Sequence, residues 1–306
     1  QSVGDTLRKM VKRLGEPVVR TAAGQAMKEM GRQFVLGRTI EEAQDRGKSQ
    51  EEQGYTYSYD MLGEAARTDA DAQRYYQAYS DAIDSISKRC KGDVRTNPGI
   101  SVKLSALLAR YEYGHKERVM NELMPRALKL ARKAAAANMG FNIDAEEQDR
   151  LDLSLDVIEA ILSDPELKDW QGFGVVVQAF GKRASQTLDW LYALSEKLDR
   201  RIMVRLVKGA YWDAEIKRAQ VMGLSDFPVF TRKACSDVAY LAGARKLLGM
   251  TDRIYPQFAT HNAHSVSAVL ELAKDLSRDK FEFQRLHGMG ESLHDQVLED
   301  SGVPCR

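Results

Sequence analysis

Gly99-Ile100-Ser101-Val102-Lys103-Leu104-Ser105 is a short apolar run that gives way to a lysine, and three later runs end in the same manner. They are Gly140-Phe141-Asn142-Ile143-Asp144, Gly174-Val175-Val176-Val177-Gln178 and Ile202-Met203-Val204-Arg205-Leu206-Val207. Polar side chains at the carboxyl ends of successive parallel strands form the active sites of (βα)8 barrels. The pattern therefore predicts an enzyme whose site contains Lys103, Asp144, Gln178 and Arg205.

The rest of the chain repeats the same unit. Strand-like runs alternate with amphipathic helical stretches, which predicts seven βα units in a row. The predicted strands cover 55–59, 100–105, 141–144, 174–178, 202–207, 255–260 and 281–286. The predicted helices cover 69–88, 115–137, 151–162, 185–198, 214–222, 230–248, 264–276 and 292–299. Helical patterns at 4–15 and 21–37, with no strand signal, predict a helical lead-in over 1–50 before a barrel over 51–306.

Repeated βα units allow either a closed barrel or an open doubly wound sheet. Strand parity favours the barrel, because Ser101 and Lys103 share one face while Val102 lies on the other. A sheet covered by helices on both faces should be apolar on both. The Gly-x-Gly-x-x-Gly nucleotide fingerprint is also missing, since Gly288-Met289-Gly290 continues without the third glycine. We therefore predict an α/β, TIM-like barrel whose eighth strand and last helix are missing from the chain.

Composition excludes several classes of protein. The 306 residues are 43% hydrophobic and 29% charged, with a formal net charge of +1, which gives no reason to expect nucleic-acid binding. No run reaches the roughly 20 apolar residues of a membrane span, and the amino terminus lacks a signal-peptide pattern. Three widely separated cysteines, Cys90, Cys235 and Cys305, argue against a disulfide framework. A soluble intracellular protein is expected.

The residues of the predicted site suit a small anion or zwitterion. Lysine and arginine can hold a carboxylate while neighbouring polar groups orient the rest of the ligand. In the stretch 205–213, Gly209 and Ala210 allow close approach of a ligand to the backbone, and Lys208 adds positive charge. Tyr211 and Trp212 offer flat surfaces for a ring system, although they could instead only cap the barrel.

Other interpretations stay open on the residues alone. Lys103 or Lys208 could form the Schiff base of a class I aldolase. His261 and His264 could be half of a metal site completed by the carboxylates of Asp144, Glu146 and Glu147, although His261 as a hydrogen-bond partner of a cofactor is favoured. The chain could also be a non-catalytic scaffold for another domain or for DNA. A metal is not predicted.

Taken together, the motifs closely resemble the proline dehydrogenase domain of the bacterial bifunctional proline utilization A flavoproteins. The similar stretches follow family order and cover nearly the whole chain from residue 31; they are 55–64, 100–106, 142–147, 205–213, 255–264 and 286–291. The resemblance implies a distorted (βα)8 barrel that binds FAD without a covalent bond. It further implies oxidation of L-proline to Δ1-pyrroline-5-carboxylate, with electrons passed to ubiquinone at the membrane. A cytoplasmic protein, peripherally associated with the inner membrane and fused to an aldehyde dehydrogenase domain, would fit that family.

The resemblance also implies roles for individual residues. Lys103 would pair with the carboxylate of proline or a proline analogue, Asp144 would order the site, and Arg205 would lie near flavin N5. Leu286, Tyr211 and Glu64 would lie on the substrate side. The remaining cofactor contacts would come from Gln178, Val207, Lys208, Gly209, Ala210, Trp212, Thr231, Arg232, Thr260, His261 and Asn262, and Tyr211 would contact the cofactor as well.

One part of the family pattern is absent from the sequence. The family's last strand supplies a tyrosine, and its last helix supplies two adjacent arginines that hold the substrate carboxylate. One of these arginines pairs with the glutamate that corresponds to Glu64. None of them follows Arg306. If the polypeptide ends there, Lys103 is the remaining carboxylate cation and proline binding should be severely weakened.

Overall fold

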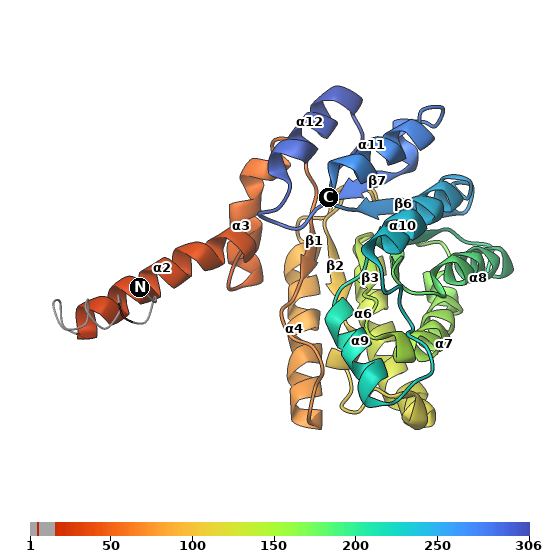
Figure 1. Ribbon diagram of the computed structural model, residues 1–306, viewed down its shortest axis with the longest axis horizontal. Coiled ribbons are helices and arrows are strands. Elements are labelled where there is room, and N and C mark those ends of the chain that lie inside the picture. The colour runs from red at the N-terminus through yellow and green to blue at the C-terminus, as the bar shows by residue number, and fades with distance from the viewer. Residues whose placement is uncertain (1–4, 6–15) are drawn as a thin grey trace.

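Seven parallel strands form the sheet in the described part of the chain. The computed structural model describes residue 5 and residues 16–306. The strands are hydrogen-bonded in chain order from the first to the seventh (Figure 1). Their bounds are β1 Ser58–Asp60, β2 Gly99–Val102, β3 Gly140–Ile143, β4 Phe173–Gln178, β5 Ile202–Val207, β6 Ile254–Ala259 and β7 Glu282–Gln284. The predicted parallel order is confirmed, and a doubly wound sheet is excluded because its strands do not follow chain order.

Contacts across the interior show that the sheet curls around a lumen. Arg205 on β5 donates hydrogen bonds to the hydroxyl of Ser58 on β1 at 3.1 Å and to that of Ser101 on β2 at 3.0 Å. Strands β1 and β5 are separated by three others in the sheet, so their side chains can meet only across a barrel interior. The predicted placement of Ser101 and Arg205 on the inner face is confirmed.

The residues after the last helix lie between β7 and β1. The Phe283 N–H donates to the Pro304 carbonyl and the Arg306 N–H donates to the Phe283 carbonyl, both at 2.9 Å. On the other side, the Thr56 N–H donates to the Cys305 carbonyl at 3.1 Å. Figure 1 shows this end of the chain beside β1 and β7. Residues 304–306 thus occupy the position of an eighth strand, in a segment too short for a periodic sequence signal.

Helices follow the strands and cover the outside of the sheet. Those after β1 to β7 include α4 Asp69–Ser87, α6 Met124–Ala136, α7 Leu151–Leu162, α8 Ala184–Lys197, α9 Trp212–Val221, α10 Lys233–Leu248, α11 Ala263–Leu272 and α12 Glu291–Ser301. Short helical segments add η1 Leu104–Ala106, η2 Tyr113–His115, α5 Lys116–Arg118, η3 Val119–Leu123, η4 Gln148–Arg150, η5 Pro165–Leu167 and η6 Arg278–Lys280. The predicted helix over 115–137 therefore contains a π-helical turn at 119–123. Pro125, which has no N–H to donate, lies at the start of the α-helix that follows.

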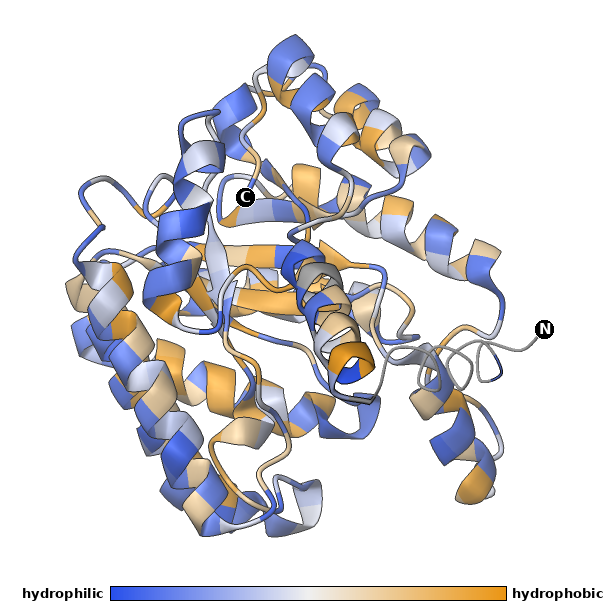
Figure 2. Cartoon of the chain, turned by 90° about the vertical axis from the view of Figure 1, so that its left-hand side faces the viewer, coloured by the Kyte–Doolittle hydropathy of each residue, from blue (hydrophilic) through white to orange (hydrophobic). Residues whose placement is uncertain are grey.

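The hydrophobic core lies between the outer face of the sheet and these helices. Val102 and Phe141 are completely buried, as are Ile83 of α4 and Leu130 of α6. Figure 2 shows hydrophobic strands inside and helices with hydrophilic surfaces outside. The strands therefore bury apolar residues against the helices, while polar residues at alternate positions, such as Ser101 and Arg205, face the lumen.

Two helices precede the first strand within residues 16–57. They are α2 Glu16–Phe34, which extends away from the barrel, and α3 Ile40–Glu51, which contacts α4 (Figure 1). The predicted helix over 21–37 is thus observed with an earlier start, whereas nearly all of the predicted helix at 4–15 lies outside the described residues. The boundary at residue 50 between a lead-in and a barrel stays a prediction.

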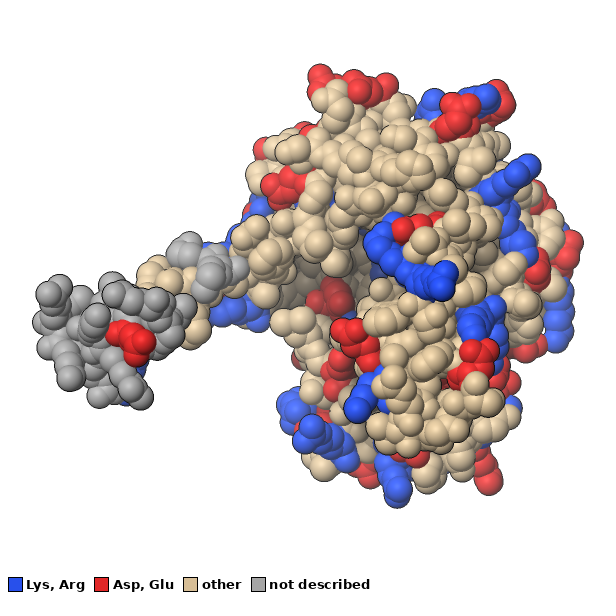
Figure 3. Space-filling model, viewed as in Figure 1, with Lys and Arg blue, Asp and Glu red and all other residues tan. Residues whose placement is uncertain are grey.

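The surface carries charges of both signs. Figure 3 shows basic and acidic side chains interspersed over the visible face. None of the described helices is both long enough and apolar enough to cross a bilayer.

Candidate active site

The residues predicted for the site gather at one end of the barrel. Lys103, Asp144 and Gln178 stand at or directly after the carboxyl ends of β2, β3 and β4. The loops after β1, β5, β6 and β7 carry, in that order, Glu64, residues 208–211, residues 260–262 and Leu286, and Trp212 begins α9. Thr231 and Arg232 are exposed and precede α10. Because all strands are parallel, their carboxyl ends face the same opening, which we call the barrel mouth.

Lys103 lies between two carboxylates at the barrel mouth. Its ammonium donates to both oxygens of Asp60, at 2.9 and 3.0 Å, and to Oδ2 of Asp144 at 3.1 Å. Its backbone N–H donates to the hydroxyl of Tyr79 rather than to a neighbouring strand. Burial lowers the pKa of Lys103, but the charges of Asp144 and Asp60 outweigh it and hold the pKa above its usual value. Lys103 is therefore a fixed positive charge.

Arg205 supplies a second cation deeper in the lumen. Besides its bonds to Ser58 and Ser101, its guanidinium lies 3.5 Å from Oδ1 of Asp144. Burial lowers the pKa of Arg205, and the charge of Asp144 opposes that effect. The Nε atom of Arg205 is buried and has no partner among the described residues. Lys103, Asp144 and Arg205 thus form the cluster that the strand ends predict.

Gln178 connects the loops after β3 and β5. Its side-chain amide donates to the backbone carbonyl of Glu146 at 2.9 Å, and its Oε1 accepts from the N–H of Ala210 at 3.0 Å. The carboxylate of Glu146 accepts in turn from the N–H of Ser105 at 3.0 Å. Burial raises the pKa of Glu146. The loops after β2, β3 and β5 are therefore held to one another through hydrogen bonds at fixed backbone positions.

The loop from β5 to α9 has an unusual backbone. Gly209 has φ of +135°, and a Cβ atom placed there would collide with the ring of Phe180. Tyr211 is left-handed, with φ of 62° and ψ of 37°. These conformations turn the aromatic ring of Tyr211 toward solvent, and its hydroxyl donates to Glu64 at 3.4 Å. The loop thus reaches across the barrel mouth from β5 to the loop after β1.

Basic and aromatic groups continue from this loop to α10. Lys208 and Lys233 both contact the carboxylate of Asp237, at 2.6 and 2.5 Å. The indole N–H of Trp212 donates to the carbonyl of Phe230, directly before Thr231. Lys208 is therefore brought close to the start of α10, where Thr231 and Arg232 lie.

His261 has a structural partner. Its Nε2 accepts a hydrogen bond from the N–H of Leu286 at 2.9 Å, which joins the loops after β6 and β7. Asn262 caps α11 by accepting from the N–H of Ser265, while its own N–H donates to the Thr260 hydroxyl at 3.2 Å. His264 is exposed. Within the described residues no three potential ligands are grouped to hold a metal ion, so the metal interpretation gains no support.

Sequence reasoning missed Asp60, the second carboxylate on Lys103. Asp60 is the last residue of β1, so the rule that selected Lys103 and Asp144 also applies to it. The predicted strand ended at residue 59, which left Asp60 in a loop. Burial and the nearby charge of Asp144 raise the pKa of Asp60, although Lys103 opposes them.

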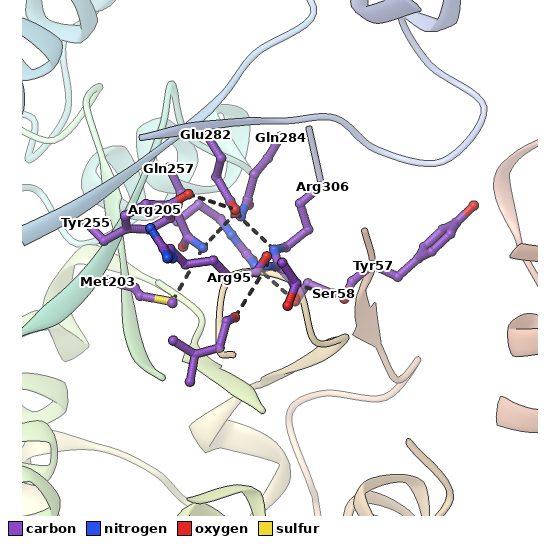
Figure 4. Close-up of polar contacts among 12 residues, drawn as sticks. Tyr57, Ser58, Arg95, Met203, Arg205, Tyr255, Gln257, Glu282, Gln284 and Arg306 are labelled. Atoms are coloured by element: carbon purple, nitrogen blue, oxygen red, sulfur yellow. Dashed lines mark hydrogen bonds and ion pairs between the residues drawn. The ribbon is translucent and has the colours of Figure 1, made fainter. Parts of the chain in front are cut away.

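A second missed group lies in the lumen near Arg205, and we call it the floor cluster. The carboxylate Oε1 of Glu282 accepts hydrogen bonds from the side chains of Gln257 at 2.8 Å, Gln284 at 2.7 Å and Arg306 at 3.0 Å (Figure 4). Tyr255 donates to the other carboxylate oxygen at 3.4 Å. Four of these residues, Tyr255, Gln257, Glu282 and Gln284, alternate with apolar neighbours on β6 and β7, which is the signal that could have identified them.

Comparison with known proteins identifies the family. The model of the proline dehydrogenase family matches residues 43–306. This chain belongs to the proline dehydrogenase family. Its resemblance to the proline utilization A group is also borne out, since it is 51% identical over 312 residues to Bifunctional protein PutA of Escherichia coli (strain K12). That match covers 100% of this chain and 24% of the relative.

Further relatives agree on this family. A Rhizobium meliloti Bifunctional protein PutA is 52% identical over 302 residues, covering 97% of this chain and 24% of the relative. A Deinococcus radiodurans Proline dehydrogenase is 27% identical over 303 residues, covering 96% of this chain and 86% of the relative. The chain thus spans about a quarter of the length of the curated PutA proteins it matches.

Solved structures support the barrel. The chain superimposes on a Bradyrhizobium japonicum Proline Utilization A (PutA) mutant with a TM-score of 0.86 and 57% identity, covering 97% of this chain and 30% of that one. It also superimposes on PutA from Bdellovibrio bacteriovorus inactivated by N-propargylglycine, with a TM-score of 0.88 and 28% identity. That second match covers 94% of this chain and 31% of the other. The fold of the proline dehydrogenase family is therefore established for this chain.

Proposed function

We propose that this chain oxidises L-proline to Δ1-pyrroline-5-carboxylate with a bound FAD. The observation that carries the proposal is the position of Lys103 between Asp60 and Asp144 at the mouth of a family-matched barrel. A lysine at this point offers a positive charge to the substrate carboxylate, and the aspartates around it balance the charge of the site. Leu286 and Tyr211, both exposed at the same end, are available to cover an apolar ring.

The residues present fit a flavin. The buried Nε of Arg205 has no partner within the described residues, and Gly209 leaves no room for a side chain beside Phe180. We assign the ring system of FAD to Gln178 and Arg205 and to residues at and between the end of β5 and the start of α9, which are Val207, Gly209, Ala210, Tyr211 and Trp212. Lys208, Thr231 and Arg232 would supply charge and hydrogen bonds for its phosphates. Thr260, His261 and Asn262 would hold the remainder, with the imidazole already engaged by Leu286.

The chain's own residues would bind and orient the substrate. When bound, FAD would supply the acceptor for the hydride that leaves the ring carbon next to nitrogen. Lys103 would hold the proline carboxylate and so direct that carbon into the lumen. Arg205, fixed by Ser58, Ser101 and Asp144, would stabilise negative charge that develops beside it, and because its hydrogen bonds are already formed it need not reorganise.

The geometry disfavours a class I aldolase. A Schiff-base lysine must be able to lose its proton, which a lowered pKa favours. Lys103 has the opposite property, because Asp144 and Asp60 raise its pKa against the effect of burial. Lys208 is paired with Asp237.

The remaining family properties are part of the same proposal. We infer that electrons pass to ubiquinone at the inner membrane from a cytoplasmic protein that associates with the membrane peripherally. A fused aldehyde dehydrogenase domain would account for the greater length of the PutA relatives. These inferences rest on the family match and not on a feature of the described residues.

One experiment tests the proposed reaction. The purified protein should show the visible absorption of oxidised flavin, and anaerobic L-proline should bleach it with formation of Δ1-pyrroline-5-carboxylate. D-proline is the matched control, because its carboxylate cannot reach Lys103 while the same carbon faces the acceptor. A borohydride-trapped adduct on lysine, with no flavin spectrum, would instead favour the aldolase.

A further inference from the structure

Asp60 and Asp144 surround the same ammonium but differ in exposure. The side chain of Asp144 is 16% exposed and that of Asp60 is 50% exposed, while Lys103 between them is 16% exposed. Asp60 therefore lies on the side of Lys103 that faces the barrel mouth.

The two aspartates also differ in their partners. Asp144 is shared by two cations, because one oxygen lies near Lys103 and the other near Arg205. Asp60 has one hydrogen-bond donor in the described part of the chain, the ammonium of Lys103, which contacts both of its oxygens. A carboxylate has about four lone-pair positions, so Asp60 can accept further hydrogen bonds from a ligand in the mouth.

The donors of Lys103 allow a ligand to join this arrangement. An ammonium has three N–H groups, and at present three acceptor oxygens surround the one on Lys103. If Asp60 turned so that only one of its oxygens stayed on Lys103, one N–H of the lysine and one oxygen of Asp60 would become available together. The site would then present a donor and an acceptor side by side.

That pair matches an α-amino acid, in which one carbon atom separates the carboxylate from the ammonium. A ligand carboxylate bound to Lys103 would bring the ligand nitrogen next to Asp60. Tyr211 is exposed at the barrel mouth, where its hydroxyl donates to Glu64 at 3.4 Å. A zwitterion adds no net charge to two cations and two carboxylates.

We propose that Asp60 binds the ring nitrogen of the substrate and makes the site select a cyclic amino acid over a ring carboxylate that lacks nitrogen. This inference rests on the proposed function, because it takes the substrate carboxylate to lie on Lys103. Asp144, which is more buried and is shared with Arg205, holds the lysine in place and does not contact the ligand nitrogen.

The test compares two ligands on the chemically reduced holoenzyme, which cannot oxidise either of them. Calorimetry measures the binding of L-proline and of (S)-tetrahydrofuran-2-carboxylate, which has a ring oxygen in place of nitrogen. Asp60→Asn should weaken proline binding by about 10- to 100-fold, the range expected for a hydrogen bond to a charged group. The oxygen analogue should bind equally well or more tightly, because a carboxylate that repels it is gone.

Two further variants complete the design. Asp144→Asn is the matched control, since it removes the other carboxylate from Lys103 and should change the affinities of both ligands by the same factor. Asp60→Glu keeps the charge, so it should retain a preference for proline even if Asp60→Asn folds poorly. If Asp60→Asn weakened the binding of both ligands equally, this inference would be overturned and the proposed function would still stand. Failure of the unmodified protein to bind either ligand would overturn the proposed function with it.

Discussion

The Nε atom of Arg306 lies 3.0 Å from Oε1 of Glu282, and the two side chains are only 3% and 1% exposed. The same guanidinium also donates to the backbone carbonyls of Asn97 at 2.9 Å and Arg95 at 2.6 Å, which precede β2. One buried ion pair thus connects β7, the residues in the eighth-strand position and the amino end of β2. The floor cluster therefore holds these three segments of the barrel together, in addition to lying near Arg205.

Glu282→Gln should destabilise the protein strongly. Removing one partner of a buried ion pair leaves an uncompensated charge and costs about 3–5 kcal/mol of unfolding free energy. Chemical denaturation of the holoprotein measures this loss. Glu271→Gln, which breaks the exposed pair with Lys274, should cost less than about 1 kcal/mol. The double variant Glu282→Met with Arg306→Met should recover part of the loss, and no recovery would argue against the ion pair as the cause.

Lys103→Met should reduce proline affinity and also change the protonation of the carboxylates around it. Loss of a charged hydrogen-bond donor is expected to weaken binding of the carboxylate by about 10- to 100-fold. Asp60 and Asp144 would then lose the ammonium between them while Asp144 keeps Arg205, so Asp60, whose pKa is already raised by burial and by Asp144, should take up a proton more readily. Titration with proline measures the first effect, and thermal unfolding with and without an added Asp60→Asn change measures the second. Lys197→Met, at the exposed pair with Glu159, should alter neither.

Gly209→Ala should displace the loop that we assign to the flavin. The new methyl group would collide with Phe180, and φ of +135° is unfavourable for alanine. The N–H of Ala210 would then lose its bond to Gln178. The ratio of flavin to purified protein should fall. Gly223→Ala is the matched control, because Gly223 also has positive φ but no neighbour that the methyl group would meet.

Stability should decrease in mild acid because of His261. Burial, and then the charges of His294 and Arg285, lower the pKa of His261 from its ordinary value of 6.5. As the pH falls through 6.5 the unfolded chain takes up the proton first, so the free energy of unfolding falls until the lower folded pKa is reached. Protonation also puts an N–H against the N–H of Leu286 and breaks their hydrogen bond.

Urea unfolding between about pH 8 and about pH 5 measures this dependence. His261→Gln can keep an acceptor for the Leu286 N–H but cannot titrate, so its stability should fall less over this range. Burial also lowers the pKa values of His287 and His294, so part of the decrease should remain in the variant. An unchanged slope in His261→Gln would show that His261 does not contribute.

Local sequence patterns predicted the order of the strands and the cluster of Lys103, Asp144 and Arg205. They succeeded because strand periodicity and a polar residue at a strand end are both properties of a few consecutive residues. They missed Asp60 because the first strand was predicted at 55–59 and so ended one residue before the observed strand Ser58–Asp60. A shift of this kind moves one polar residue from the strand end into a loop.

Contacts between distant segments could not be predicted in this way. The bond from Leu286 to His261 and the bonds of Arg306 join positions that no local pattern relates. The eighth-strand position was missed for the same reason, since Pro304–Arg306 is recognised only by its partners Phe283 and Thr56. The roles of individual residues toward proline and FAD stay proposals, because they depend on groups that lie outside the chain.

The meeting of residues 304–306 with Thr56 has a consequence for how the barrel folds. Each strand from β2 to β7 can pair with the strand made just before it, but closure must bring together residues such as Tyr57 and Arg306, which are 249 positions apart. Contacts of such large sequence separation form slowly, because a long loop must close first. Until then β1 and β7 both present unpaired edges that can join another chain. Aggregation during synthesis should therefore depend on how fast residues 304–306 pair with the segment before β1. Variants at Arg306 should increase the aggregated fraction before they alter the folded site.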